Sequence, residues 1–387
     1  MNAASTAAAA ESYEGPVATV DLEALAHNTA AVKRRLAPGV KVLAAVKANA
    51  YGHGLPATAV ALAGLGVEWF GVATPSEALT LRNAGIVGGV LLLTPVREPT
   101  VITRLVAAGV SLVVTDLGGL AALAGCDLPE TASVHLKLDT GMGRLGVTWQ
   151  AAPALARAVA ADKRFALQGT FTHLAASDEE DRRETQAQLE QFERGLAGIL
   201  AEGIDPGLVH AANSAAIVAY PEHHYDMVRP GISLYGYYPA ERFASLEPGL
   251  RQVMRFDAPV TFVKRLEKGD SVSYGGLWHA QRETVVATLR VGYADGYRRS
   301  LTGKSWVGFE GRRLQVIGRV CMDQLMVDVE DLDVEVGDRM VLWGPGGPSA
   351  EDLAAAIGTV SYELLTGVAA RVERSYLGGN KDVSARR

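Results

Sequence analysis

The stretch Val42-Leu43-Ala44-Ala45-Val46-Lys47-Ala48-Asn49-Ala50-Tyr51-Gly52-His53-Gly54 places a lysine between an apolar run and a glycine-containing turn. The apolar run predicts a strand that is buried on both faces, as in a parallel sheet. Lysine is rarely buried without a reason, so Lys47 at the end of such a strand has two interpretations. Either its head group reaches water, or it is desolvated and serves as a nucleophile or Schiff-base former.

The alternation of short apolar runs with longer amphipathic segments continues from this stretch to about residue 236. The expected strands are Lys41–Lys47, Trp69–Ala73, Gly89–Leu93, Ser111–Thr115, Val134–Asp139, Ala166–His173, Leu208–Asn213 and Met227–Tyr235. The expected helices include Leu55–Leu65, Pro75–Ala84, Pro99–Ala108, Ala151–Ala161 and Arg182–Ala201. Eight strands that alternate with helices predict an α/β fold of the (β/α)8 TIM-barrel type.

After about residue 240 the helical periodicity fades and short β-type runs follow one another. The expected strands are Ala258–Val263, Thr284–Val291, Leu314–Val320, Leu325–Val329 and Arg339–Leu342, with one helix at Ala350–Ile357. We therefore expect a disordered tail at 1–15, a cofactor-binding barrel at 16–240, a mostly β domain at 241–377 and a flexible tail at 378–387. A separate strand at Val17–Val20 can join the β domain, and Asp21 can cap a helix at Leu22–Leu36.

Composition limits the kinds of function. The 387 residues carry a formal net charge of −6, which argues against general nucleic-acid binding. No apolar run has the length of a membrane span, and no cationic leader precedes an apolar segment, so we expect neither membrane insertion nor export. The only cysteines, Cys126 and Cys321, have no metal-binding or disulfide spacing. A cytoplasmic protein is expected.

Candidate functional residues lie in or near the carboxyl ends of several expected barrel strands, where barrel enzymes carry their chemistry. Lys47 ends the first strand, Lys137 lies within the fifth with Arg144 after it, His173 ends the sixth, Asn213 and Ser214 end the seventh, and Arg229, Gly231 and Ile232 lie in the eighth. The Ser214 hydroxyl and the backbone N–H groups of Gly231 and Ile232 form a candidate phosphate cradle. A phosphate cradle with a buried lysine and arginines indicates pyridoxal 5'-phosphate. A sugar-phosphate enzyme would explain the cradle but not the lysine, tyrosine and arginine set.

At this point the sequence resembles the alanine racemase family over nearly its whole length. The supporting stretches, in family order, are Ala45–Gly54, Lys137–Gly146, His210–Ala215, Val228–Gly236, Ser273–Gly276, Gly292–Gly296 and Ile317–Gln324. The resemblance implies a barrel, a C-terminal β domain and a homodimer in which each active site takes residues from both subunits. It also implies interconversion of L- and D-alanine, which supplies D-alanine for peptidoglycan.

The same resemblance implies roles for individual residues. Lys47 would hold the cofactor covalently and act as one base, and Tyr274 of the other subunit would be the second base. The cofactor would contact Tyr51, His173, Asn213, Ser214, Arg229, Gly231, Ile232 and Tyr362, with Arg229 facing the pyridine nitrogen. The substrate carboxylate would contact Arg144, Met322 and Asp323. His173, close to Arg229, would favour the Tyr274 phenolate through hydrogen bonding and positive charge.

Several alternatives remain open. Lys137 matches a position that is often carbamylated in the family, or it pairs with an acid such as Asp139. Other enzyme readings are an amino-acid decarboxylase or a serine or broad-specificity racemase, and a reading from another class is a non-catalytic pyridoxal phosphate carrier. His223, His224 and His279 have no acidic or cysteine partner at a useful spacing, so we expect surface histidines and no metal site.

Overall fold

The computed structural model describes residues 15–246, 249–330 and 332–378. These residues form two compact units. The barrel unit contains the described residues from Asp21 to Val253 and from Tyr376 to Gly378. The β unit combines Met254–Ser375 with the described residues up to Val20. The tails expected at 1–15 and 378–387 lie almost wholly outside the described residues.

The barrel unit contains two parallel four-stranded arcs, in the order β4-β3-β2-β9 and β5-β6-β7-β8. Isolated parallel bridges join Leu91 to Ser111 and Asn213 to Arg229, so the two arcs close into one ring. The strands are β2 (Lys41–Ala45), β3 (Trp69–Val72), β4 (Gly89–Leu92), β5 (Leu112–Val114), β6 (Ala132–Lys137), β7 (Phe165–Phe171), β8 (Leu208–His210) and β9 (Met227–Val228). The predicted (β/α)8 barrel is therefore present.

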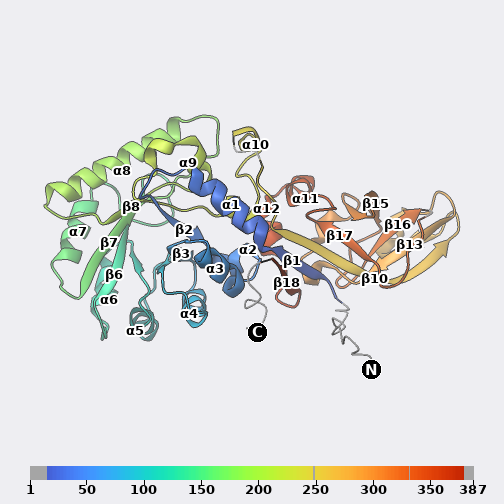
Figure 1. Ribbon diagram of the computed structural model, residues 1–387, viewed down its shortest axis with the longest axis horizontal. Coiled ribbons are helices and arrows are strands. Elements are labelled where there is room, and N and C mark those ends of the chain that lie inside the picture. Colours follow the sequence, from blue (N-terminus) through green and yellow to red (C-terminus); the bar gives the residue numbers. More distant parts are fainter. Residues whose placement is uncertain (1–14, 247–248, 331, 379–387) are drawn as a thin grey trace, which may run out of the picture. The chain divides into compact units, whose positions relative to one another are not determined.

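Helices alternate with these strands and lie outside them in the barrel unit (Figure 1). They are α1 (Leu22–Arg34), α2 (Lys47–Tyr51), α3 (Leu55–Gly64), α4 (Pro75–Asn83), α5 (Pro99–Ala107), α6 (Leu117–Ala124), α7 (Ala152–Ala160), α8 (Arg183–Ala201), α9 (Ser214–Ala219) and α10 (Phe243–Leu246). Local sequence sets several starts: Asp21 caps α1, a Thr74–Glu77 capping box opens α4, and Asn213 caps α9.

The β unit is built on one sheet in the order β13-β16-β15-β14-β17-β10-β1-β18, and it closes through an additional β10–β13 pairing. Its strands are β1 (Val17–Asp21), β10 (Met254–Leu266), β13 (Thr284–Leu289), β14 (Trp306–Phe309), β15 (Arg312–Ile317), β16 (Leu325–Glu330), β17 (Arg339–Trp343) and β18 (Glu373–Leu377). A short hairpin, β11 (Ser271–Val272) with β12 (Trp278–His279), and helices α11 (Ala350–Ile357) and α12 (Ser361–Thr366) complete it. β1 pairs antiparallel with β10, which places the N-terminal strand in this sheet.

All eight barrel strands end earlier than predicted, and two of these differences bear on the site. The strand expected at Met227–Tyr235 is β9 alone, and Ile232–Tyr235 is the 3-10 helix η2. The strand expected to reach Lys47 ends at Ala45. An apolar run does not distinguish a buried strand from another buried conformation, and tertiary packing decides between them.

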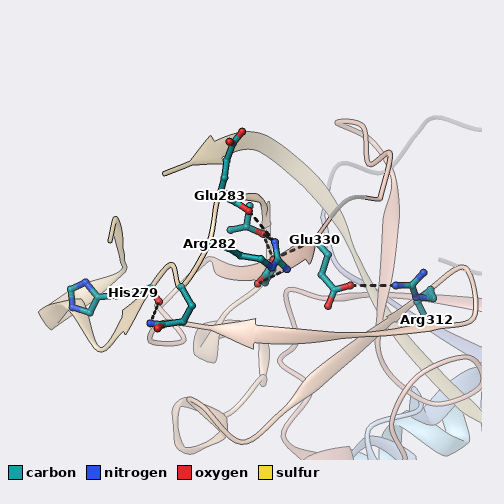
Figure 2. A network of polar contacts seen from close by, with 8 residues as sticks. His279, Arg282, Glu283, Arg312 and Glu330 are labelled. Carbon is teal, nitrogen blue, oxygen red and sulfur yellow. Dashed lines mark hydrogen bonds and ion pairs between the residues drawn. The ribbon is translucent and has the colours of Figure 1, made fainter. Parts of the chain in front are cut away.

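Exposed ion pairs lie on the sheet of the β unit. Arg312 on β15 lies 3.3 Å from Glu330 on β16, and Figure 2 shows this pair beside a second group around Arg282. Such exposed pairs contribute little stability. None of the helices in the described residues is long and apolar enough to cross a membrane.

Candidate active site

Lys47 opens a left-handed turn. Ala48, Asn49, Ala50 and Tyr51 all have φ between 52° and 56°. Left-handed backbone costs an L-residue about 1–2 kcal/mol, so the surrounding structure must impose this turn. The turn places Lys47 beyond the strand, at the rim where barrel enzymes work.

Packing and side-chain hydrogen bonds hold the turn. Asn49 Oδ1 accepts a hydrogen bond from the Leu55 N–H at 2.8 Å. The Tyr235 ring stacks on Tyr51 and on His53, with centroids 4.8 and 4.5 Å apart. The Tyr235 hydroxyl also donates to the Ala45 carbonyl at 3.0 Å. Tyr235 comes from η2, so a segment distant in sequence fixes the turn after Lys47.

The residues expected to form a phosphate cradle come from separate loops and contact one another. Ser214 Oγ accepts two hydrogen bonds, one from the Gly231 N–H at 2.9 Å and one from Ser233 Oγ at 3.1 Å. A Cβ atom at Gly231 would lie 2.6 Å from the Tyr51 hydroxyl oxygen, so Tyr51 closely approaches the backbone there. Ile232 follows as the buried first residue of η2. Asn213 is beside the cradle, but its Oδ1 is used internally by Ser177 Oγ and the Ala216 N–H.

Arg229 is buried, and its hydrogen-bond partners are neutral acceptors. Its guanidinium donates to the carbonyls of Thr172 and Ala211 at 2.8 and 2.9 Å, and to His210 Nδ1 at 3.0 Å. Burial lowers the pKa of Arg229 to about 9, which leaves it charged at neutral pH. Among the described residues, no carboxylate contacts the guanidinium, so its charge is available to a ligand beside it.

His210 contacts Arg229, although the sequence predicted no role for this residue, which begins the stretch His210–Ala215. Because Arg229 can only donate, His210 Nδ1 is an acceptor and its Nε2 carries the proton. That Nε2 donates to His135 Nδ1 at 3.0 Å. Burial, and then Arg229, hold the pKa of His210 well below its usual range, so the imidazole is neutral.

His173 also contacts Arg229, at 3.3 Å through Nδ1. Burial and then the charge of Arg229 hold the pKa of His173 well below its usual range. A neutral His173 that accepts through Nδ1 carries its proton on Nε2, where it is a donor. The positive charge expected near a phenolate is therefore carried by Arg229 and not by the imidazole.

Two lysines share this electrostatic environment. Burial and then Arg144 lower the pKa of Lys47. Burial and then Arg229 lower the pKa of Lys137 to about 7. Lys137 Nζ donates to the Leu138 carbonyl at 2.5 Å, whereas Asp139 accepts from the N–H groups of Gly141 and Gly143. The structure thus gathers Lys47, Lys137, Arg144, His173 and Arg229 in one region, since all four cations depress the pKa of His173.

The remaining candidate residues lie in the β unit. Tyr274 is in the 3-10 helix η3 (Tyr274–Gly276) with 72% of its surface exposed, and Met322 is 53% exposed. Tyr362 is half-buried in α12.

Asp323 has a different environment from the one expected. Its carboxylate lies 2.6 Å from Arg371, which also contacts the buried Asp295 at 2.7 Å. A carboxylate that is paired in this way is poorly suited to bind a substrate carboxylate directly. The backbone of Met322 is a better donor, because its N–H makes no hydrogen bond to the described residues while its carbonyl accepts one from the Ala294 N–H at 3.0 Å.

The prediction of surface histidines is wrong for His224. His224 is buried, with Nε2 2.9 Å from the Ile217 carbonyl, because its chain segment packs under α9. His223 is half-buried and His279 is exposed. Within residues 15–246, 249–330 and 332–378, no group of three potential metal ligands occurs.

Comparison with known proteins identifies the family. The model of the alanine racemase N-terminal domain matches residues 20–239, and that of the alanine racemase C-terminal domain matches residues 253–376. A relative named alanine racemase from Symbiobacterium thermophilum is 43% identical over 371 residues, 93% of this chain and 97% of its own.

Solved structures agree with the sequence relatives. The alanine racemase of a D-cycloserine-producing Streptomyces lavendulae superposes with a TM-score of 0.88 at 36% identity, over 96% of this chain and 100% of its own. The alanine racemase of Bacillus anthracis, solved with bound L-Ala-P, gives a TM-score of 0.89 at 31% identity, over 96% and 97%. With both domain models matched along the chain, this protein belongs to the alanine racemase family.

Proposed function

We propose that the chain is a pyridoxal 5'-phosphate-dependent isomerase that interconverts L- and D-alanine by moving the Cα proton between two bases. The observation that carries this proposal is the barrel rim. There, Lys47 with a lowered pKa shares one region with buried Arg229, and Tyr51, Ser214 and Gly231 form the cradle described above. The family supplies the substrate, alanine.

The chain's residues fit the cofactor. The Ser214 hydroxyl, the Gly231 and Ile232 backbone and the Tyr51 hydroxyl would hold its phosphate. Lys47 would hold it covalently. When bound, pyridoxal phosphate supplies an electron sink for the bond broken at Cα. Arg229, cationic and donor-only, would face the pyridine nitrogen and keep it unprotonated, which weakens the sink and suppresses transamination.

Two residues would move the proton. The lowered pKa of Lys47 favours its neutral amine, which can accept a proton from one face of the substrate. Tyr274 would serve the opposite face. A phenol has a reference pKa of about 10, so it needs tuning. His173 Nε2–H and the charge of Arg229 would supply it by stabilising the phenolate.

Substrate orientation would depend on Arg144 and on the free N–H of Met322, which together fit a carboxylate. Asp323 would act by holding the Met322 segment through Arg371. Lys137, if carbamylated, becomes an anion between cationic neighbours and would hold Arg144 in place. Its pKa of about 7 supports this, because only the neutral amine reacts with CO2.

We further propose a homodimer in which a second copy of the chain provides Tyr274 and Met322. The support is their exposure in the single chain, since a base that is 72% exposed is poorly shielded for proton transfer. Both cysteines are free, which fits a reducing cytoplasm where D-alanine for peptidoglycan would be made.

The test is a coupled assay of the purified holoenzyme with L- and D-alanine, beside L- and D-serine. We expect turnover of both alanine enantiomers and much slower turnover of serine. Comparable rates on serine would favour the broad-specificity alternative. A yellow protein that leaves both alanine enantiomers unchanged would favour the carrier.

The two-base assignment has its own test in Tyr274→Phe. The two enantiomers have equal free energies, so the racemisation efficiencies must fall together in both directions. Exchange of the Cα proton with solvent deuterium is free of that constraint. We expect exchange to collapse for one enantiomer and to persist for the other, and equal, small losses for both would contradict the assignment.

A further inference from the structure

Ser273, the residue directly before Tyr274, has an unusual backbone. Its φ is +67° and its ψ is −177°, a conformation that glycine adopts readily and serine does not. Strained residues persist only where surrounding contacts impose them, and they cluster at functional sites. The strain lies one peptide away from the proposed second base.

A hydrogen bond and close packing impose the Ser273 conformation. Ser273 Oγ donates to the Arg319 carbonyl at 2.9 Å and lies 3.4 Å from Cys321 Sγ. On the facing segment, a Cβ atom at Gly318 would lie 2.8 Å from both the Ser273 Cβ and the Val272 carbonyl oxygen. The segment that carries Tyr274 is therefore pressed against the segment from Gly318 to Cys321.

The facing segment leads to Met322, and its backbone is fixed in turn. The Cys321 carbonyl accepts from the Tyr293 N–H at 3.0 Å, and the Met322 carbonyl accepts from the Ala294 N–H at 3.0 Å. The free N–H of Met322 is thus held on a rigid frame. Ser273 is the side chain that joins this frame to the Tyr274 segment.

We propose that Ser273 is a positioning residue that holds the Tyr274 phenol in register with the Met322 N–H. The proposal rests on the proposed function, in which Tyr274 moves the proton and Met322 binds the carboxylate. Without the Oγ bond, the strained backbone of Ser273 is free to relax. Relaxation would swing Tyr274 relative to the substrate while leaving the phenol chemically intact.

Ser273→Ala removes the hydrogen bond and keeps the Cβ. We expect kcat to fall about tenfold, because the net free energy of one ordinary hydrogen bond corresponds to about a tenfold change in rate. KM should change less than about twofold. Ser273→Gly also lacks the hydroxyl. Glycine accommodates φ of +67°, so folding is not impaired, but nothing then holds the backbone in that conformation and kcat should fall by a comparable factor.

Ser305→Ala is the matched control. Ser305 is buried in the same unit, and its Oγ donates to the Leu301 carbonyl at 3.2 Å, so this variant loses the same type of bond away from Tyr274. Its kcat should stay within about twofold of wild type, since lost stability alone does not alter the turnover of the folded enzyme.

The decisive readout is the primary deuterium isotope effect, measured on the holoenzyme with Cα-deuterated L-alanine and D-alanine separately. In Ser273→Ala and Ser273→Gly the effect should rise for the one enantiomer whose Cα bond faces Tyr274, because that step becomes slower. Isotope effects equal to wild type for both enantiomers, or an equal loss of kcat in Ser305→Ala, would overturn the proposal. Failure of the proposed function is visible separately, as a wild-type protein without racemase activity.

Discussion

Replacing Gly231 by alanine tests the phosphate cradle directly. The added methyl carbon would lie 2.6 Å from the Tyr51 hydroxyl oxygen and 3.2 Å from Tyr51 Cζ, whereas ordinary contact begins at 3.4 Å. The phenol must therefore move away by about 0.8 Å in a close-packed environment. Tyr51 cannot do this freely, because its ring stacks on Tyr235 and its backbone is left-handed.

The expected loss follows from that displacement. A hydrogen bond to a charged acceptor contributes about 1.5–3 kcal/mol, so a displaced Tyr51 hydroxyl should weaken cofactor binding by about 10- to 150-fold. Overpacking should also lower the free energy of unfolding by about 1–3 kcal/mol. The assay is a titration of the apoprotein with pyridoxal phosphate in which binding is monitored by tryptophan fluorescence. Thermal unfolding is measured in parallel.

Two further variants separate the cradle from general effects. Gly64→Ala adds a methyl group in α3 where no atom lies within 4 Å, so its cofactor affinity should equal that of wild type. Tyr51→Phe removes the hydroxyl by itself. The double variant Gly231→Ala/Tyr51→Phe should bind no more weakly than Gly231→Ala, because both changes remove the same contact. Wild-type affinity in Gly231→Ala, or fully additive losses in the double variant, would refute this reasoning.

Other predictions concern the charged residues around the site. Burial lowers the pKa of Lys137 to about 7, so bicarbonate should raise activity above that pH, where the amine is neutral, and have little effect well below it. Intact-mass spectra should show one added CO2 in the wild type above pH 7 and none in Lys137→Met. An unmodified wild type above pH 7 would contradict the carbamylation of Lys137. Arg371→Lys removes the guanidinium that bridges Asp295 and Asp323 and so loosens the Met322 segment proposed to bind the substrate carboxylate. KM for alanine should rise about 3- to 10-fold in both directions, with a smaller change in kcat. Arg312→Gln, which breaks the exposed pair in Figure 2, is the control, and an equal rise in KM there would contradict the role of Arg371.

Local signals in the sequence were sufficient for the architecture. Short apolar runs that alternate with amphipathic segments predicted the barrel strands, and polar side chains at Asp21 and Ser349 do cap the helices that follow them. These features depend on neighbours within a few residues, which the sequence displays directly. The helix α6 and strand β14 were not predicted. Leu117–Ala124 is apolar on most sides, so it lacks the periodicity by which a surface helix is recognised.

The sequence predicted candidate site residues where they follow strands, as Lys47 and Arg229 do, because parallel strands bring their carboxyl ends to one rim. It did not predict the hydrogen-bond and ion-pair partners of these residues. Arg229 is held by carbonyls of Thr172 and Ala211 and by His210, which come from other strands. Asp323 pairs with Arg371, a residue far away in sequence, so its assignment as a substrate ligand did not account for that ion pair.

The opening stretch shows where the two kinds of information divide. Apolar patterning and glycine are local properties, so the sequence predicted a buried strand that leads through Lys47 into a glycine-containing turn. The tertiary structure was needed to show that the strand ends at Ala45 and that four successive non-glycine residues have left-handed backbone conformations. That conformation is unfavourable for the segment alone. It exists because Tyr235, nearly two hundred residues later, stacks against the turn and bonds to its strand.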